Sequence, residues 1–405
     1  MKNSTTRSKI VVVGGGFAGI EVVRRLAKER AFDVTLVSNN SCFQYYPSLY
    51  RLVVGATVNQ VSIPLRRIVP KRATLLIDTY MSVDPIRKCI VLKSGTEVAY
   101  DYVVMALGSE PNYFGIDGME THSKSFLSIT KATALNAYFL DLIEQSKTMG
   151  REEAAMKLHT IIVGAGPSGV ELAGALPSYL KKHAKKHGVD ASLITVDLLD
   201  SGARVLPAIP ENASALVTEQ LKKKGVTIYS NYGVNACDED CVIAANKNIE
   251  GSEPVHMKAG TIIWTAGTKI NGLFSAIPGV VMTEKKRVTV TPTLTLPSDD
   301  TIYIIGDGSG TPFSGLAQTA IDQGKYIAMA LQHRINGNAV SDYVPKQGVF
   351  VIPVGRGWAI LNYKTLVLHG LTPWVMRIMV DARYFLSITS PWHVISMLFK
   401  KKSTI

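Results

Sequence analysis

Two glycine-rich segments have the residue types and spacing of turns that bind the pyrophosphate of a dinucleotide. Both fit the pattern G-x-G-x-x-G, in which the first glycine permits a tight turn, the second lets the backbone approach the phosphates, and the third lets the next helix pack on the strand. The phosphates are expected at the N-terminus of that helix. The residues concerned are Gly14, Gly15, Gly16, Phe17, Ala18 and Gly19 in the first segment, and Gly164, Gly166, Pro167, Ser168 and Gly169 in the second.

The end of the second strand usually carries an acid for a ribose hydroxyl, and the two repeats differ at this position. In the second repeat Asp200 ends the run VDLLD, where a carboxylate repels a 2′-phosphate and favours NADH over NADPH. Arg204 lies nearby and weakens this inference slightly. In the first repeat the position is Ser38, followed by Asn39. Two dinucleotide sites in one chain predict two cofactors, FAD in the first and NADH in the second.

Strand-like and helical patterns alternate around both turns. Apolar strand-like runs at 10–13 and 33–38 enclose a helical pattern at 17–30, and the same order recurs after residue 160. Such alternation predicts an α/β fold with parallel sheets. We expect two doubly wound, Rossmann-like domains and a C-terminal amphipathic helical region. The predicted boundaries are 1–118 and 290–343 for the FAD domain, 119–289 for the NADH domain, and 344–405 for the C-terminal membrane-association region.

The composition narrows the class of partner. The chain has 405 residues, with 44 Lys+Arg against 32 Asp+Glu and a formal net charge of +12. This excess suits an anionic cofactor or an anionic lipid surface. Nucleic acid is not expected, because no recognition motif accompanies the charge. The opening MKNSTTRSK lacks the apolar core of a secretory signal. Four cysteines are too few for a disulfide scaffold in a chain of this length, so a reducing, cytoplasm-facing compartment is expected.

Neither the cysteines nor the histidines indicate a redox or metal centre. Cys42 has no partner close in sequence, as a disulfide reductase would need, and Cys89 is similarly isolated. Cys237 and Cys241 flank the acidic run DED, which discourages a thiolate. We expect all four to be structural. His183 and His187 have helical i,i+4 spacing but lie among lysines that repel a cation, so no metal site is expected.

The tail after residue 370 has the composition of helices that lie in a membrane interface. Arg377, Asp381 and Arg383 interrupt the tail. It therefore contains no run of about 18 apolar residues, the length that a helix needs to span a bilayer. Its tryptophans and other apolar residues, with arginines and Lys400–Lys402, favour contact with anionic lipid. Pro391 is expected to separate two short helices. The alternative is that the tail forms an ordinary pair of helices that packs on the rest of the chain or in a dimer.

Six segments, in order, resemble those of type II NADH:quinone oxidoreductase, a single-subunit respiratory enzyme that pumps no protons. They are FQYYPSLYRLVVGA, ALGSEPNYFGIDG, GAGPSGVELAGAL, IIWTAGTKIN, IYIIGDGSG and GLAQTAIDQGKYIA. The resemblance covers nearly the whole chain. It implies a peripheral protein on the cytoplasmic face of the cell membrane, which transfers a hydride from NADH to FAD and two electrons from FAD to a membrane quinone. A homodimer is left open.

The resemblance also implies roles for individual residues. Glu171 would act near the nicotinamide and flavin, and Gln318 would lie by the isoalloxazine and the quinone. The alternatives are a first-turn acid that satisfies the helix dipole and a helix amide without a ligand. Asn39 would lie by the FAD ribose, the Val83 backbone by the adenine, and Asp307 by the ribityl chain. The other implied cofactor contacts are Ser38, Ala106, Gly108, Gly267, Gly306 and Ala320.

Two other functions remain open on the sequence. One is a soluble NAD(P)H-dependent FAD reductase for a protein acceptor such as ferredoxin, which the tail disfavours. The other is a non-catalytic, redox-sensing flavoprotein whose assembly changes when NADH binds. Fast NADH-driven quinone reduction would exclude this second function.

Overall fold

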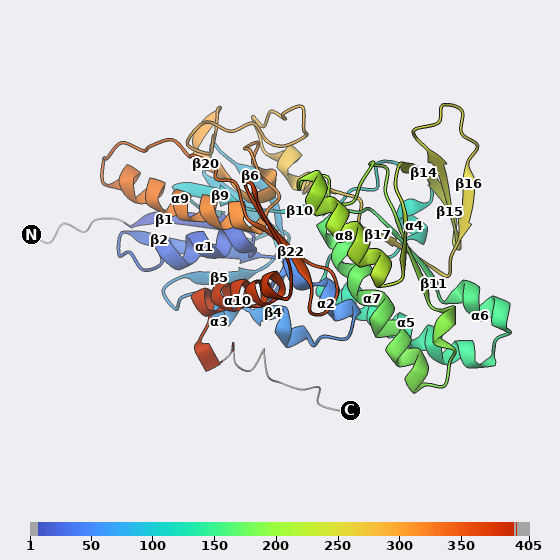
Figure 1. The fold of residues 1–405 in the computed structure, drawn as a ribbon. Coiled ribbons are helices and arrows are strands. Elements are labelled where there is room, and N and C mark those ends of the chain that lie inside the picture. The colour runs from blue at the N-terminus through green and yellow to red at the C-terminus, as the bar shows by residue number, and fades with distance from the viewer. Residues whose placement is uncertain (1–6, 393, 395–405) are drawn as a thin grey trace, which may run out of the picture. The chain divides into compact units, whose positions relative to one another are not determined.

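The chain forms two compact units, each assembled from three segments. The computed structural model describes residues 7–392 and residue 394. Unit 1 comprises the segment ending at Gln44 together with Ser62–Glu110 and Thr268–Gly348. Unit 2 comprises Tyr45–Val61, Pro111–Gly267 and the segment beginning at Val349. Figure 1 shows the course of the chain, which confirms the predicted α/β class. Which segments serve which cofactor remains a prediction.

Unit 1 is built on a six-stranded sheet whose strand order is β19-β20-β9-β1-β2-β5. β1 is parallel to both neighbours, with Ile10 opposite Val34 and Tyr102. The strands are β1 (Ser8–Val13), β2 (Phe32–Ser38), β5 (Thr74–Ile77), β9 (Tyr102–Met105), β20 (Asp299–Ile304) and β19 (Thr295–Leu296), the last antiparallel to β20. The chain also forms β3 (Cys42–Gln44), β4 (Ser62–Pro64), α3 (Leu65–Ile68), β10 (Ser109–Pro111) and β18 (Thr268–Ile270).

Both faces of this sheet are covered, which explains why the last four residues of β1, from Ile10 to Val13, are all apolar. Helices α1 (Phe17–Leu26) and α9 (Ala317–Ile335) pack together on one face, as Figure 1 shows. Val11 and Val13 point to the other face, where they share a core with Ile90 and Leu92. That second layer is the antiparallel sheet β6 (Tyr80–Asp84), β7 (Cys89–Leu92) and β8 (Glu97–Ala99).

Unit 2 repeats the plan around a four-stranded parallel sheet of order β13-β12-β11-β17. The strands are β11 (His159–Val163), β12 (Thr195–Leu199), β13 (Val226–Tyr229) and β17 (Thr261–Trp264). The helices are α2 (Tyr50–Val53), α4 (Met119–His122), α5 (Ile129–Gln145), α6 (Arg151–Lys157), α7 (Pro167–Lys186) and α8 (Glu211–Lys223). An antiparallel sheet of β14 (Tyr232–Cys237), β15 (Cys241–Asn246) and β16 (Val255–Lys258) shares a core with β11.

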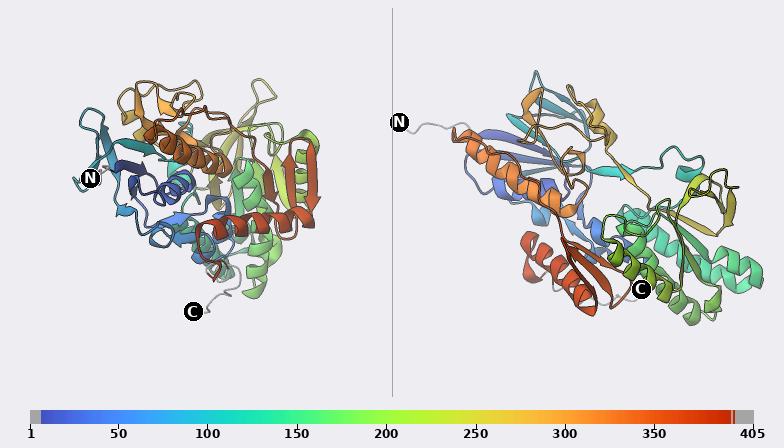
Figure 2. Two further views of the ribbon diagram at one scale, coloured as in Figure 1. Left: turned by 90° about the vertical axis from the view of Figure 1, so that its left-hand side faces the viewer. Right: turned by 45° about the horizontal axis from the view of Figure 1, so that its top comes forward.

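The C-terminal part of unit 2 is an antiparallel sheet followed by one long helix. The strands are β21 (Phe350–Pro353), β22 (Ala359–Tyr363) and β23 (Leu366–Gly370), and the helix is α10 (Leu371–Ile388). Figure 2 shows α10 lying against these strands. Helix α10 has 18 residues and ends at Ile388, before Pro391, and most of the segment expected to form a second helix lies outside the described residues. Among the helices within the described residues, none combines the length and apolarity needed to cross a bilayer.

Helix α10 buries two of its charged residues and exposes several of its large apolar ones. Its inward face buries Pro373, Arg377, Asp381, Phe385 and Ile388. Its outward face exposes large apolar side chains, namely Leu371, Val375, Met376, Met379, Val380 and Leu386. The expectation that Arg377 supplies positive charge to a lipid surface is therefore wrong, because its guanidinium is buried in unit 2 and paired with acids. Arg383 is exposed, and Lys400–Lys402 lie outside the described residues.

Candidate active site

The first glycine of each turn adopts a backbone conformation that L side chains rarely adopt. Gly14 has φ 117° and Gly164 has φ 109°. A Cβ on Gly14 would collide with the Ala106 carbonyl oxygen, and one on Gly164 would lie 2.6 Å from Ala266. In each sheet, the backbone just after the neighbouring strand, β9 or β17, lies so close to this glycine that no residue with a side chain fits there. Ala106 thus packs on the first turn, and its predicted contact with the cofactor stays a prediction.

The third glycine of each turn allows the helix to pack closely, and the second leaves space open at the helix N-terminus. A Cβ on Gly19 or Gly169 would collide with the carbonyl oxygen of the first glycine, so only glycine lets the helix pack here. A Cβ on Gly16 or Gly166 would meet no described atom within 4 Å. Both residues are N-caps, of α1 and α7, and no side chain among the described residues caps either helix. The N-terminus of each helix thus faces an open cradle, and the positive end of the helix dipole there fits a dinucleotide pyrophosphate.

The residues at the two strand ends make backbone contacts. Asp200 accepts hydrogen bonds from Ala165 N–H and Gly202 N–H, each at 2.6 Å. Its carboxylate thus holds the second glycine turn in shape, and its predicted contact with a ribose stays a prediction. The Ser38 hydroxyl donates to the Asn40 carbonyl at 2.8 Å, and Asn39 is exposed beside it.

The GDG segment is held by a residue that the sequence analysis missed. The Gln323 side chain is fully buried, accepts a hydrogen bond from Gly306 N–H at 2.6 Å and donates to Thr311 at 2.8 Å. Asp307 accepts a hydrogen bond from the Ser109 hydroxyl at 2.6 Å, and its carbonyl accepts one from Arg287. A helix glutamine carries no sequence signal for burial, so nothing in the pattern distinguished Gln323 from the exposed Gln318.

The other predicted cofactor contacts are spread over the two units. In unit 1, Val83 and Ala320 are buried, Gly108 has φ 72°, and Gln318 lies exposed in the first turn of α9, as expected. Phe17 and Ala18 begin α1, and Pro167 and Ser168 begin α7. In unit 2, a Cβ on Gly267 would lie 2.8 Å from the Phe114 ring. Their contacts with cofactors remain predictions.

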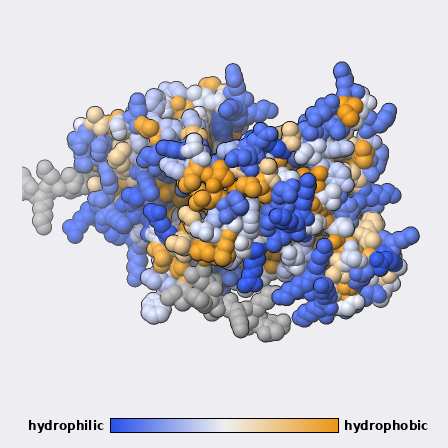
Figure 3. Space-filling view, in the orientation of Figure 1, coloured by the Kyte–Doolittle hydropathy of each residue, from blue (hydrophilic) through white to orange (hydrophobic). Residues whose placement is uncertain are grey.

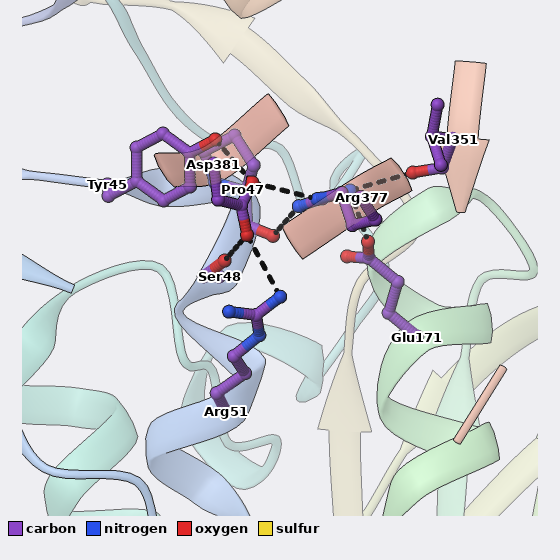
Figure 4. Close-up of polar contacts among 8 residues, drawn as sticks. All are labelled: Tyr45, Pro47, Ser48, Arg51, Glu171, Val351, Arg377 and Asp381. Carbon is purple, nitrogen blue, oxygen red and sulfur yellow. Dashed lines mark hydrogen bonds and ion pairs between the residues drawn. The ribbon is translucent and has the colours of Figure 1, made fainter. Parts of the chain in front are cut away.

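Glu171 belongs to a buried charged cluster in unit 2, drawn in Figure 4. It lies in the second turn of α7, only 6% exposed, and its carboxylate is 3.2 Å from the Arg377 guanidinium. The first turn of α7 contains no acid, so the alternative of a first-turn acid for the helix dipole is wrong. Arg377 also donates to the carbonyls of Val351 at 2.7 Å and Pro47 at 2.6 Å.

Asp381 lies on the other side of the same guanidinium. Arg377 Nε donates to it at 3.0 Å, and Arg51 donates to its second oxygen at 2.9 Å. The Tyr45 hydroxyl donates to it at 2.7 Å, and Ser48 lies at 3.5 Å (Figure 4). Two acids and two arginines thus form a cluster that is neutral overall when both acids are ionised.

The electrostatics of the cluster make Glu171 a group that can exchange a proton. Burial raises the pKa of Glu171 to about 7, against the opposing charges of Arg377 and Arg51 and with the help of Asp381. Burial, followed by the charge of Asp381, holds the pKa of Tyr45 far above its usual range, so its hydroxyl stays protonated. A carboxyl that titrates near neutral pH is suited to general acid–base chemistry.

Three of the four cysteines are buried, and Cys42 is partly exposed. Cys237 and Cys241 are buried on β14 and β15, and burial raises the pKa of the Cys237 thiol to about 11, with a further contribution from Asp238. Burial also raises the pKa of Cys241.

The two histidines of α7 contact protein side chains. His187 pairs with Glu144 at 3.0 Å, and the His183 ring packs on Tyr179.

Comparison with known proteins agrees with this geometry. The chain is 26% identical over 411 residues to a type II NADH:quinone oxidoreductase of Staphylococcus haemolyticus, covering 98% of each chain. It is 26% identical to the type II NADH:quinone oxidoreductase Ndh of Mycobacterium tuberculosis, covering 94% of this chain and 85% of that relative. The resemblance identified from the six motifs is thereby confirmed.

Solved structures show the same fold. The structure of NDH2 from Plasmodium falciparum in complex with NADH superposes with a TM-score of 0.87 at 19% identity, covering 97% of each chain. The sulfide:quinone oxidoreductase of Aquifex aeolicus gives 0.77 at 19% identity, covering 98% of this chain and 96% of that one. The family model of pyridine nucleotide-disulphide oxidoreductases matches residues 8–324, which contain both glycine turns and Glu171. The chain therefore belongs to the pyridine nucleotide-disulphide oxidoreductase family.

Proposed function

We propose that this chain is a flavoprotein that oxidises NADH and reduces a membrane quinone without pumping protons. The observation that carries the proposal is the pair of glycine turns, each with an open second glycine at an uncapped helix N-terminus. The near full-length relatives named type II NADH:quinone oxidoreductase support the same conclusion. FAD supplies the acceptor for the hydride of NADH and the donor of two electrons to the quinone.

Each unit has its own task in this proposal. The unit 1 turn around Gly16 holds the FAD pyrophosphate, and the unit 2 turn around Gly166 holds that of NADH. Asp200, which shapes the second turn, favours NADH by its negative charge. Gln318 hydrogen-bonds the quinone, and Glu171 holds a proton near the site of hydride transfer.

The cysteines separate this proposal from sulfide oxidation. One structural neighbour is a sulfide:quinone oxidoreductase, and oxidation of sulfide by this chain would call for reactive cysteine thiolates. Here Cys237 and Cys241 are buried in strands of unit 2, and their pKa values are raised mainly by burial. A thiol with a raised pKa is a poor nucleophile. NADH therefore remains the donor that the site favours.

The outer face of α10 supports peripheral membrane association. Figure 3 shows hydrophobic side chains at the surface over α10 and the C-terminal sheet. They include Met379, 63% exposed, and Leu366 on β23, 49% exposed. Because Arg377 and Asp381 point inward and Arg383 is the exposed charge of α10, this face can enter the interface of an anionic bilayer while the helix stays attached to unit 2. We place the protein on the cytoplasmic face of the membrane.

The redox proposal is tested by anaerobic reduction of the purified protein with NADH, followed by reoxidation with a water-soluble quinone and read by flavin absorbance. Rapid bleaching by NADH and rapid return of the absorbance with quinone are expected. Reduction by NADH with return only after addition of ferredoxin would favour the soluble reductase. Bleaching too slow for turnover would favour the redox sensor.

Membrane association is tested with Met379→Glu and anionic liposomes. The variant should partition at least tenfold more weakly than the wild type, because a charge replaces an apolar side chain at the interface. Ile86→Glu is the matched control, since Ile86 is 96% exposed in a turn of unit 1. Equal loss in both variants would contradict the assignment of α10. Unchanged partition with a smaller oligomer in Met379→Glu would instead show that this face forms a dimer.

A further inference from the structure

We propose that Asp381 is a positioning residue that sets the strength of the Arg377–Glu171 ion pair and thereby the proton affinity of Glu171. The inference rests on the proposed function, in which Glu171 acts near the site of hydride transfer. Asp381 touches neither cofactor nor substrate in this account. It acts through the guanidinium of Arg377, which lies between the two carboxylates (Figure 4).

The guanidinium is fixed from every side. Nη1 donates to Glu171 at 3.2 Å and to the Val351 carbonyl at 2.7 Å, and Nη2 donates to the Pro47 carbonyl at 2.6 Å. Nε donates to Asp381 at 3.0 Å. Arg377 is 8% exposed, so water does little to screen these charges. Its charge is divided between two acids, and the longer of the two contacts is the one to Glu171.

Asp381 is the group that divides this charge. It is 5% exposed and also accepts hydrogen bonds from Arg51 and Tyr45, so its negative charge compensates two guanidinium groups at once. Without that charge, Arg377 and Arg51 would both act on Glu171 alone. Coulomb attraction is strong where the effective dielectric constant is low, so Glu171 would then release its proton at lower pH.

The charged groups around Glu171 act on its pKa in two opposite directions. Arg377 and Arg51 favour its ionised form, Asp381 favours its protonated form, and Tyr50 lies buried beside the cluster. Burial of the carboxyl is the largest influence and raises its pKa. Loss of Asp381 and loss of Arg51 should therefore move the titration of Glu171 in opposite directions.

Such a setting matters because the proposed reaction consumes a proton. NADH, one proton and a quinone give NAD⁺ and the quinol, so a group of the site that is protonated at the working pH can supply that proton. A carboxyl serves best when it titrates close to that pH. Asp381 keeps Glu171 in this range, and it does so from the helix whose outer face we assign to the membrane.

The first experiment follows the protonated carboxyl of Glu171 by infrared difference spectroscopy of the oxidised, flavin-loaded protein across pH. The band is assigned as the one that Glu171→Gln removes. In Asp381→Asn its midpoint should fall by at least one pH unit, and in Arg51→Gln it should rise. Asp141→Asn removes an exposed carboxylate of α5 and is the matched control, in which the midpoint should stay.

Two outcomes overturn the proposal. One is a midpoint that stays within 0.3 pH units, about a factor of two in proton affinity, in both Asp381→Asn and Arg51→Gln. The other is a Glu171 band that does not titrate in the wild type. If Asp381→Asn loses its flavin, Arg51→Gln alone decides by the direction of its shift. The infrared band is independent of turnover, so failure of NADH to bleach the flavin would count against the proposed function alone.

Chemical rescue supplies a further readout that a purely structural role would not move. A cavity of about 100 Å³ lies against Asp381, lined also by Arg51, Gln60 and Phe385. In Asp381→Ala, added formate can enter this space and replace the lost carboxylate. Formate should return the titration midpoint of Glu171 toward that of the wild type, whereas formamide should not. Equal effects of formate and formamide would contradict the role of the charge.

Discussion

The two glycine turns are nearly the same in backbone geometry, yet the glutamates that follow them have different environments. Glu21 and Glu171 each come two residues after the third glycine, and both are buried. Glu21 pairs at 2.6 Å with Arg25, four residues along α1, whose side chain is 46% exposed. Glu171 pairs with Arg377, whose side chain is 10% exposed and which lies 206 residues away in the sequence.

The difference shows which properties are local and which are imposed by the fold. The turn itself depends on glycines within six residues, so both copies acquire the same cradle. The partner of the glutamate depends on which element packs over the helix. The pair at α1 has one side in water, whereas the pair at α7 is buried beside a second acid, where unpaired charge is costly, and a second, partly exposed arginine contacts that acid.

Removing the two arginines should give the largest contrast. Arg377→Met leaves Glu171 without its nearest cation and should lower the unfolding free energy of unit 2 by about 3–5 kcal/mol. Arg25→Met breaks a half-exposed pair and should cost about 0.5 kcal/mol or less. Tryptophan fluorescence during denaturation reports unit 2, because Trp264, Trp358, Trp374 and Trp392 all lie in it, and circular dichroism follows the unfolding of unit 1 as well. Comparable losses in the two variants would contradict the distinction.

Filling the two cradles should separate the two cofactors. Gly16→Leu puts a side chain where the FAD pyrophosphate is proposed, and the purified protein should lack flavin. Gly166→Leu should retain flavin but bind NADH at least a hundredfold more weakly, a loss of about 3 kcal/mol. Flavin absorbance and NADH titration measure the two effects. Loss of flavin in Gly166→Leu, with Gly16→Leu still loaded, would reverse the assignment of the units.

The pH dependence of stability should distinguish the two glutamates. Because the folded pKa of Glu171 is raised to about 7, the folded state holds this proton more tightly. Its stabilising contribution is full below about pH 4.5 and is lost as pH rises to about 7. Wild-type unit 2 should therefore lose about 3 kcal/mol relative to Glu171→Gln across this range.

Glu21→Gln, which breaks only the pair with Arg25, should cost about 0.5 kcal/mol at pH 7. Denaturation at several pH values gives both results. A difference between wild type and Glu171→Gln that is flat with pH would show that Glu171 does not titrate in this range.

The smallest expected effect compares the two half-reactions. Gln318→Leu removes one proposed hydrogen bond to the quinone, worth about 0.5–1.5 kcal/mol, and should slow flavin reoxidation roughly two- to twelvefold. Flavin reduction by NADH should hardly change, whereas Glu171→Gln should alter that step. Stopped-flow absorbance separates the steps. Equal slowing of both steps by Gln318→Leu would mean that this residue holds the flavin.

The parts of the site that could be predicted are those set by short-range interactions. The turns, the strand-end position of Asp200 and the first-turn position of Gln318 each depend on a contiguous segment of about 30 residues. The cluster could not be predicted in this way, because Glu171, Asp381 and Arg51 come from three distant segments. The i,i+4 spacing of Arg377 and Asp381 was the available signal, and an apolar helix gave no reason to expect its charges inside.

The burial of Arg377 and Asp381 on α10 also sets an order of events during synthesis. Glu171 leaves the ribosome 206 residues before Arg377, an interval of about 10–40 s at ordinary elongation rates. During that time the carboxyl of α7 has no cation from α10, and the cheapest state for it in a collapsed chain is the protonated one. Arrival of α10 brings a cation and an acid together, so the helix can dock without burying net charge. Unit 2 is thus completed by its last long helix, and a nascent chain arrested before residue 377 exposes an incomplete core to cellular proteases.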